Sequence, residues 1–196
     1  EKAAVARSPI AWAIVGFFGL QSLGFYAILS WLPTLLIAGG VTPAAAGGFL
    51  GLATAVGIPA GLVLSGVIGR FKSLAWWAAG ASFATLVGYL LLLLSLNDHG
   101  LVAAACIFIG LGQASTFPMS LSIIGTRAST RAQTTQLSAM AQGWGYLLAA
   151  LGTFVVGFIA NAAGSWVPSV VMLCALTALQ VGVGFYSGRP GVIPAK

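Results

Sequence analysis

The stretch LVAAACIFIGLGQASTFPMSLSII, residues 101–124, decides the fold class of this chain. It contains no Asp, Glu, Lys, Arg or His, and it is longer than the roughly 20 apolar residues that a helix needs to cross a bilayer. A backbone surrounded by lipid must satisfy its own hydrogen bonds, and the stretch lacks the strict alternation of a barrel strand. It therefore predicts a transmembrane helix.

Five further apolar runs of similar length lie on either side of this stretch. They cover, approximately, residues 10–38, 44–68, 74–96, 134–162 and 167–186. Residues typical of turns separate several of them: GGVTP at 39–43, NDHG at 97–100 and GS at 164–165. The sequence therefore predicts an all-α membrane protein with six transmembrane helices.

Composition excludes a soluble domain. The chain has 196 residues, of which 59% are hydrophobic and 5% charged, whereas a soluble domain carries about 25% charged residues. Its net charge of +6 comes from Lys and Arg that are scattered singly, so it forms no basic patch and we expect no nucleic-acid partner. Cys106 and Cys174 fall inside apolar runs and are interpreted as core residues, so we expect neither a metal site nor another cofactor.

The distribution of basic residues predicts the orientation. All eight lie before the first run, after the last, or in the second and fourth of the five connections: Lys2, Arg7, Arg70, Lys72, Arg127, Arg131, Arg189 and Lys196. Basic residues concentrate on the cytoplasmic side of membrane proteins. We therefore predict a multi-pass protein of the cell membrane with both ends in the cytoplasm, residues 1–9 forming a cytoplasmic segment and 187–196 a cytoplasmic tail. Residue 1 is Glu rather than Met, and 1–9 lacks the features of a signal peptide, which indicates a piece of a longer protein.

Polar residues inside the apolar runs form three sets with helical spacing. Such residues face protein or a water-filled cavity, because they are costly against lipid. Hydrogen bonds between helices, worth about 1 kcal/mol each, would account for the serines. A glutamine amide has four hydrogen-bonding sites, which makes a polar pocket the better interpretation of the glutamines. The predicted substrate-binding residues are Gln21, Tyr26, Gln113, Thr116, Gln142 and Tyr146.

No ionisable Asp, Glu, Lys, Arg or His lies inside a run; Asp98 and His99 fall in a connection. A membrane-embedded hydrolase or metalloenzyme would need such groups at depth, so the chain is not expected to be an enzyme. Neutral amides, hydroxyls and aromatic rings suit a small solute that is held by hydrogen bonds and ring contacts. The chain also has 27 glycines, many at spacings that allow helices to pack closely.

Several motifs resemble the cyanate/nitroimidazole permease (CynX/NimT) family of the major facilitator superfamily. They are GLQSLGFY at 19–26 with WLP at 31–33, GLGQ at 110–113 with FP at 117–118, LSAMAQ at 137–142, GYLLAALG at 145–152 and GSW at 164–166. Thr153 departs from the proline that is common in the family after the GYLLAALG motif. Six spans with both ends inside fit one half of such a transporter, which is built of two inverted three-helix repeats.

The resemblance implies that residues 1–196 are the C-terminal half of a twelve-helix secondary transporter, whose partner is a missing N-terminal six-helix half. It implies alternating-access transport of a small solute, either cyanate-like or another small anion or nitrogen-containing compound, in a bacterial inner membrane. The third and sixth runs, which carry few polar residues, are expected to face lipid. Two alternatives stay open: a self-contained six-helix homodimeric transporter or channel, and a non-transporting membrane scaffold.

Overall fold

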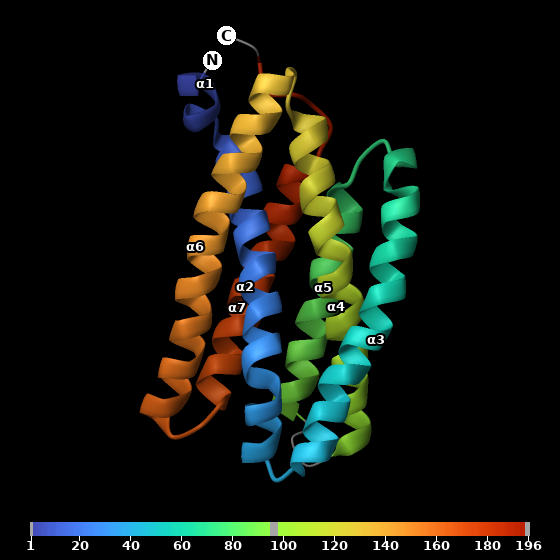
Figure 1. The fold of residues 1–196 in the computed structure, drawn as a ribbon, viewed down its shortest axis with the longest axis vertical. Coiled ribbons are helices and arrows are strands. Elements are labelled where there is room, and N and C mark those ends of the chain that lie inside the picture. Colours follow the sequence, from blue (N-terminus) through green and yellow to red (C-terminus); the bar gives the residue numbers. More distant parts are fainter. Residues whose placement is uncertain (1, 95–97, 195–196) are drawn as a thin grey trace.

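A computed structural model describes residues 2–94 and 98–194, with the side chains from Val5 onward. Its helices are α1 (Lys2–Arg7), α2 (Pro9–Ala38), α3 (Pro43–Val67), the 3₁₀ turn η1 (Ile68–Arg70), α4 (Ala75–Leu94), α5 (His99–Arg127), α6 (Arg131–Ala163) and α7 (Val167–Ser187) (Figure 1). The end of the third predicted span at 95–96, the turn residue Asn97, Glu1 and Lys196 lie outside the described residues, as does the Lys2 side chain.

The six predicted membrane spans are confirmed. Helices α2 to α7 are each long and apolar enough to cross a membrane, and α5 contains the stretch 101–124. Local sequence explains several boundaries. The Asp98 carboxylate accepts from Gly100 N (2.8 Å) and Leu101 N (3.2 Å) and begins α5, while Thr130 caps α6. Helix α6 ends at Gly164, whose φ of 61° favours glycine.

The helices pack as two interlocked triplets, α2–α4 and α5–α7. The first helix of each triplet packs on the second and third helices of the other, so α2 lies against α6 and α7, and α5 against α3 and α4. The two third helices, α4 and α7, also pack together. This exchange of partners is what two inverted three-helix repeats produce, and it agrees with the predicted half of a major facilitator fold.

Basic side chains gather at one end of this bundle, which we call the basic end. Helix α1, the turn between α5 and α6, the link from η1 to α4 and the described C-terminal tail all lie there (Figure 1). The links from α2 to α3 and from α6 to α7 lie at the opposite end, where α5 begins beside Asp98. The separation of charge that was read from the sequence is therefore also a separation in space.

The described part of the C-terminal tail is fastened to the basic end by Arg127, which is only 6% exposed. Its guanidinium donates through Nε to Ser187 O (2.9 Å), through Nη1 to Gly191 O (3.0 Å) and through Nη2 to Tyr186 O (3.4 Å). Ile193 N donates in return to Arg127 O (2.8 Å). The arginine thus satisfies carbonyls at the end of α7 that the helix itself leaves free.

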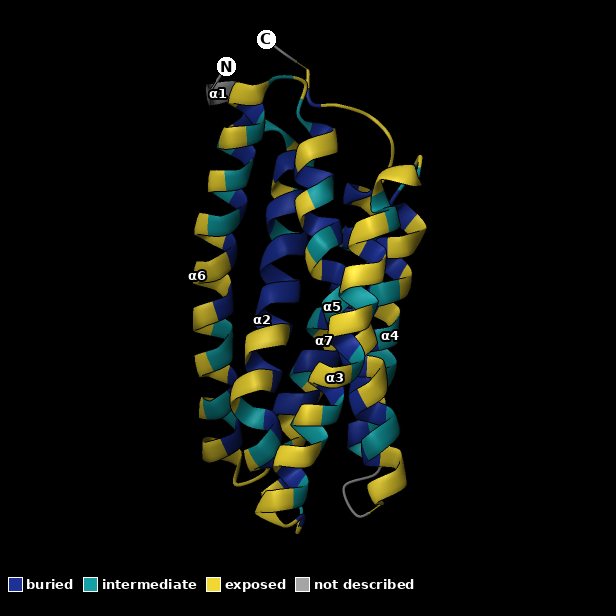
Figure 2. Cartoon of the chain, turned by 45° about the vertical axis from the view of Figure 1, so that its right-hand side comes forward, coloured by how far each residue is buried: buried dark blue, intermediate teal, exposed yellow. Residues whose placement is uncertain are grey.

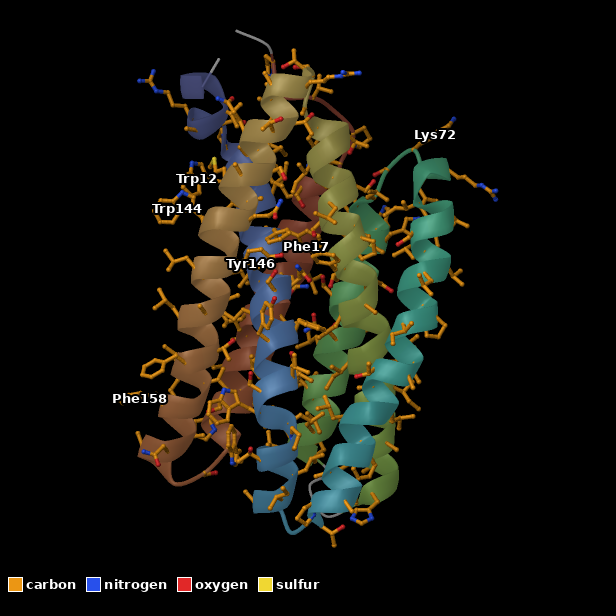
Figure 3. The ribbon with its side chains drawn as sticks, viewed as in Figure 1. Trp12, Phe17, Lys72, Trp144, Tyr146 and Phe158 are labelled. Atoms are coloured by element: carbon orange, nitrogen blue, oxygen red, sulfur yellow. The ribbon has the colours of Figure 1, made fainter. Side chains whose placement is uncertain are left out.

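Helices α3 and α6 are the least enclosed (Figure 2). Their exposed side chains are largely apolar. Leu62 on α3 is 69% exposed and Phe158 on α6 is 61% exposed; Phe158 points away from the bundle (Figure 3). Trp12 and Trp144 lie together on the same outer side, with ring centroids 6.3 Å apart. Such surfaces suit contact with lipid or with further helices.

The third and sixth runs, which were expected to face lipid, also carry polar residues that the sequence analysis passed over. Helix α7 buries Gln180, whose Nε2 donates to Ser82 Oγ of α4 over 3.0 Å. Both side chains are almost fully enclosed between the two helices. A single glutamine in an apolar run therefore marks a helix–helix contact here rather than a cavity.

Candidate functional site

A cavity of about 290 Å³ opens between α2, α5 and α6. Four of the six predicted site residues line it, namely Gln21, Tyr26, Gln113 and Tyr146. The remaining lining residues are Ser22, Phe25, Ala114 and Phe117. Residues that are distant in sequence and lie on three helices thus meet at one hollow.

Gln113 lies where α2, α4 and α5 meet, and it is 5% exposed. With its amide nitrogen toward α2, Nε2 donates to Gln21 O (3.1 Å), while Oε1 accepts from Tyr89 Oη (3.3 Å) and from Phe25 N (3.3 Å). This orientation gives every amide atom a partner of the right polarity. The side chain therefore lines the cavity from a fixed position.

Gln21 is 1% exposed, and its Nε2 donates to Ser22 Oγ over 2.7 Å. Its amide oxygen receives no hydrogen bond from the described part of the chain. Because Gln21 also lines the cavity, this oxygen is available to a solute that donates a hydrogen bond.

Aromatic rings form a continuous chain along the cavity. The centroid of Phe18 lies 6.3 Å from that of Phe117 and 5.2 Å from that of Tyr146. Tyr146 is followed by Tyr26 (6.5 Å), and Tyr26 by Phe25 (5.4 Å).

Among these aromatic residues, Tyr26 and Tyr146 are exposed and carry a polar group. Tyr26 and Tyr146 are 42% and 40% exposed, and Tyr146 lies where α6 passes α2 (Figure 3). Their hydroxyls make no hydrogen bond to the residues that the structure describes. They can therefore donate to, or accept from, a solute that rests against the rings.

The other two predicted site residues lie outside the cavity lining. Thr116 is fully buried, and its Oγ1 donates to Gln113 O over 3.0 Å. Gln142 is half-buried on α6, and its Nε2 donates to Ser138 Oγ over 2.7 Å. That these two residues contact a solute stays a prediction.

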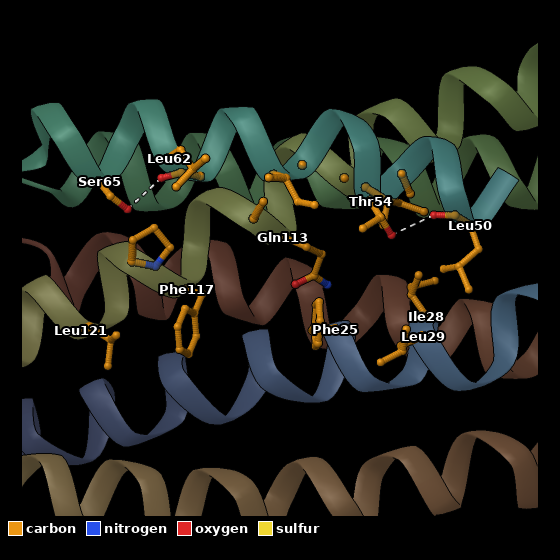
Figure 4. A pocket seen from close by; sticks show the side chains of 18 residues that line it. Phe25, Ile28, Leu29, Leu50, Thr54, Leu62, Ser65, Gln113, Phe117 and Leu121 are labelled. Atoms are coloured by element: carbon orange, nitrogen blue, oxygen red, sulfur yellow. Dashed lines mark hydrogen bonds between the residues drawn. The ribbon is translucent and has the colours of Figure 1, made fainter. Parts of the chain in front are cut away.

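A second hollow of about 500 Å³ lies between α2, α3 and α5, and we call it the side hollow (Figure 4). It shares Phe25, Gln113, Ala114 and Phe117 with the first cavity. Its two hydroxyls are occupied within α3, since Thr54 donates to Leu50 O (3.0 Å) and Ser65 to Gly61 O (2.7 Å). The side hollow is thus apolar, apart from the edge formed by Gln113.

Sequence reasoning missed Tyr89 and the role of Phe25. Tyr89 lies on α4 and is fully buried, with its hydroxyl 3.3 Å from both Gly24 O and the Gln113 amide. The available signal was a tyrosine in the middle of an apolar run, but that run was assigned to lipid. Phe25 adjoins Tyr26 in sequence, yet only the structure shows that it lines both hollows.

The chemistry of the cavity is neutral. Its lining consists of amides, hydroxyls, aromatic rings and one alanine, with no charged side chain. In the ranges 2–94 and 98–194 no three His, Cys, Asp or Glu residues come together as a metal site would require. The cavity can hold a solute by hydrogen bonds and by contact with rings.

Comparison with known proteins places the chain among transporters. Residues 2–153 match the family model of the Major Facilitator Superfamily. The chain is 33% identical over 189 residues to the uncharacterized transporter YycB of Bacillus subtilis (strain 168), covering 96% of this chain and 47% of that protein. It is 34% identical over 183 residues to the 2-nitroimidazole transporter of Escherichia coli (strain K12), covering 93% and 46%.

A third relative is the cyanate transport protein CynX of Escherichia coli (strain K12), with 28% identity over 163 residues, covering 83% of this chain and 41% of that protein. The chain therefore spans about half the length of the relatives it matches. These relatives are named as transporters and not as enzymes, which agrees with the expectation from the missing ionisable groups.

Proposed function

The chain belongs to the Major Facilitator Superfamily, and on that premise we propose that it is the C-terminal six-helix half of a secondary transporter for a small solute. The observation that carries the proposal is the cavity at which Gln21, Tyr26, Gln113 and Tyr146 meet from three helices. Relatives of about twice the length leave room for a second six-helix half.

Alternating access is the mechanism that we propose. In this fold the solute binds near the middle of the bilayer between two halves, which rock about it and expose it to each side in turn. The exposed apolar faces of α3 and α6, and the open side of the cavity, are the surfaces that the N-terminal half would cover. Here the internal contacts of α2 with α6 and of α5 with α3 would keep this half rigid while it moves.

For the solute we favour a compact, uncharged ring compound that contains nitrogen. Amides and hydroxyls between aromatic rings suit such a compound, and no cationic side chain of the cavity would offset an anion. Among the relatives, one is named for 2-nitroimidazole and another for cyanate. The neutral lining favours a solute of the first kind over a small anion.

The protein crosses the membrane several times, and we propose that the basic end lies in the cytoplasm. The excess of Arg and Lys at that end supports this orientation. The three relatives described above come from bacteria, which supports a bacterial inner membrane.

Uptake by the purified whole protein in proteoliposomes tests this proposal. Labelled 2-nitroimidazole and cyanate are supplied to vesicles that contain the whole protein, to vesicles that contain residues 1–196 alone, and to empty vesicles. We expect uptake of the nitroimidazole above the empty vesicles with the whole protein only. Uptake by residues 1–196 alone would support the self-contained homodimer instead, and no uptake of either solute would support the non-transporting scaffold.

A further inference from the structure

We propose that Tyr89 is a positioning residue that sets the specificity of the solute site: it occupies the amide oxygen of Gln113, so that this side chain offers the cavity only a hydrogen-bond donor. The inference rests on the proposed function, since it concerns how the same cavity selects its solute. Tyr89 lies on α4, which contributes no residue to the cavity lining.

The position of Tyr89 is tightly defined. The side chain is fully buried, and its hydroxyl lies 3.3 Å from the Gln113 amide of α5 and 3.3 Å from Gly24 O of α2. Gly24 makes the approach possible, because a Cβ there would come within 3.2 Å of Tyr89 Oη and would overlap with the side-chain amide of Gln113. One hydroxyl thus reaches the two helices, α2 and α5, that carry the glutamines of the cavity.

The polarity of the neighbouring backbone decides how the Gln113 amide is oriented. Gln21 O can only accept and Phe25 N can only donate, so the amide nitrogen faces Gln21 and the amide oxygen faces Phe25. In this orientation the single Tyr89 hydroxyl proton points to the amide oxygen rather than to Gly24 O, because the hydroxyl and amide oxygens, 3.3 Å apart, would repel each other with no proton between them. A reversed amide would put two acceptors together at Gln21 O and two donors together at Phe25 N.

Counting hydrogen-bonding sites shows what remains for a solute. The Gln113 oxygen has two lone pairs, which Phe25 N and Tyr89 Oη fill. The nitrogen has two N–H groups, and Gln21 O is its one acceptor among the described residues. Gln113 therefore presents one free N–H to the cavity, which recognises an acceptor such as a nitro or carbonyl oxygen.

Removing the Tyr89 hydroxyl would free one lone pair of the Gln113 oxygen. A solute that donates a hydrogen bond could then use this oxygen, so the relative affinity of the cavity would shift toward donors. The remaining N–H would also become a weaker donor, because a hydrogen bond to the amide oxygen polarises the whole amide.

The test compares nitrobenzene and aniline, two uncharged rings that differ only in carrying an acceptor or a donor group. Their affinities for the purified whole transporter are measured by thermal stabilisation, in the wild type, in Tyr89→Phe and in Tyr186→Phe. Tyr186, which is 44% exposed near the end of α7, is the matched control. We expect Tyr89→Phe to shift the ratio of the two affinities about fivefold toward aniline, the effect of one hydrogen bond, and Tyr186→Phe to leave this preference ratio unchanged.

A lower melting temperature of Tyr89→Phe with an unchanged preference would overturn the proposal, because the hydroxyl would then serve only to hold α4 against α2. A second measurement needs no solute: the side-chain amide protons of Gln113, assigned by their loss in Gln113→Leu, are followed by NMR in protein labelled with ¹⁵N-glutamine. We expect them to exchange faster with water in Tyr89→Phe, and unchanged exchange would contradict the proposal. Failure of both rings to bind the wild type, with the expected change in exchange, would count against the proposed solute class while supporting the hydrogen bond from Tyr89.

Discussion

Gly24 of α2 lies directly against the side-chain amide of Gln113 of α5, so that a Cβ at position 24 would overlap with this amide. Gly24→Ala should therefore displace the amide and the Tyr89 hydroxyl beside it. Adding a methyl group to such a packed contact costs about 1–3 kcal/mol of folding stability. Because the displaced amide lines the cavity, we also expect weaker solute binding by the whole protein, measured as a higher KM for uptake.

Gly16→Ala is the matched control for this change, since Gly16 lies in the same helix and a Cβ there would make only an ordinary contact with Val183 Cγ1 at 3.7 Å. The control should keep both its KM and its melting temperature. A Gly24→Ala protein with the KM of the wild type would show that the Gln113 amide does not contact the solute.

Close packing of α5 on α3 gives a prediction for stability. A Cβ at Gly110 would overlap with Ala53 O, a backbone atom that cannot turn aside. Gly110→Ala should destabilise the bundle by about 1–3 kcal/mol, measured by thermal unfolding in detergent. Gly125→Ala in the same helix meets nothing within 4 Å, and it should leave the stability unchanged or raise it slightly, because alanine favours a helix over glycine. Equal effects of the two changes would contradict the close contact between α3 and α5.

The fastening of the tail gives a second prediction for stability. Arg127→Ala removes three hydrogen bonds to carbonyl oxygens at the end of α7 and in the tail, and we expect a loss of about 1.5–3 kcal/mol with faster proteolysis after residue 187. Arg131→Ala serves as the control, because it removes an exposed arginine at the start of α6, just after the turn that follows Arg127. Equal proteolysis of the two variants would show that the Arg127 guanidinium does not hold the tail.

Orientation can be tested by cysteine labelling in intact cells, because the native Cys106 and Cys174 are both buried. Ser165→Cys lies in the exposed link between α6 and α7, and Lys72→Cys lies at the basic end. A maleimide that cannot cross the cell membrane should label Ser165→Cys directly, and Lys72→Cys only after the membrane is opened. The reverse pattern would place the basic end outside the cytoplasm.

The fold could be predicted closely because each of the six membrane spans has its own local sequence pattern. Uninterrupted apolar runs specify the spans, and the cap residues Asp98, Thr130 and Gly164 specify where helices begin and end. Helix α1 was not predicted, since six residues are too few to show a period. The pairing of α2 with α6 and of α5 with α3 was not predicted, because no local pattern specifies which helices meet.

The candidate site could be predicted in part. Gln21, Tyr26, Gln113 and Tyr146 stood out because polar groups are rare inside apolar runs, and they do line one cavity. Thr116 and Gln142 have the same chemistry and helical spacing, yet their polar atoms bond to residues of their own helices. Whether a polar side chain faces a cavity or its own helix depends on the rotation of the helix against its neighbours, which sequence spacing does not specify. Tyr89 was missed for the same reason.

The most direct test of whether the cavity holds the solute compares Gln113→Leu with Gln142→Leu in the whole protein. The quantity measured is uptake of the solute that the proteoliposome assay identifies. Both changes remove an amide from a membrane span, but only Gln113 lines the cavity. Initial rates are measured over a range of solute concentrations and divided by the amount of folded protein. We predict that Gln113→Leu raises KM about tenfold, as expected when a buried polar partner is lost, and that Gln142→Leu has a smaller effect because its amide lies outside the cavity lining. A larger effect of Gln142→Leu, or no effect of Gln113→Leu, would contradict the placement of the solute in this cavity.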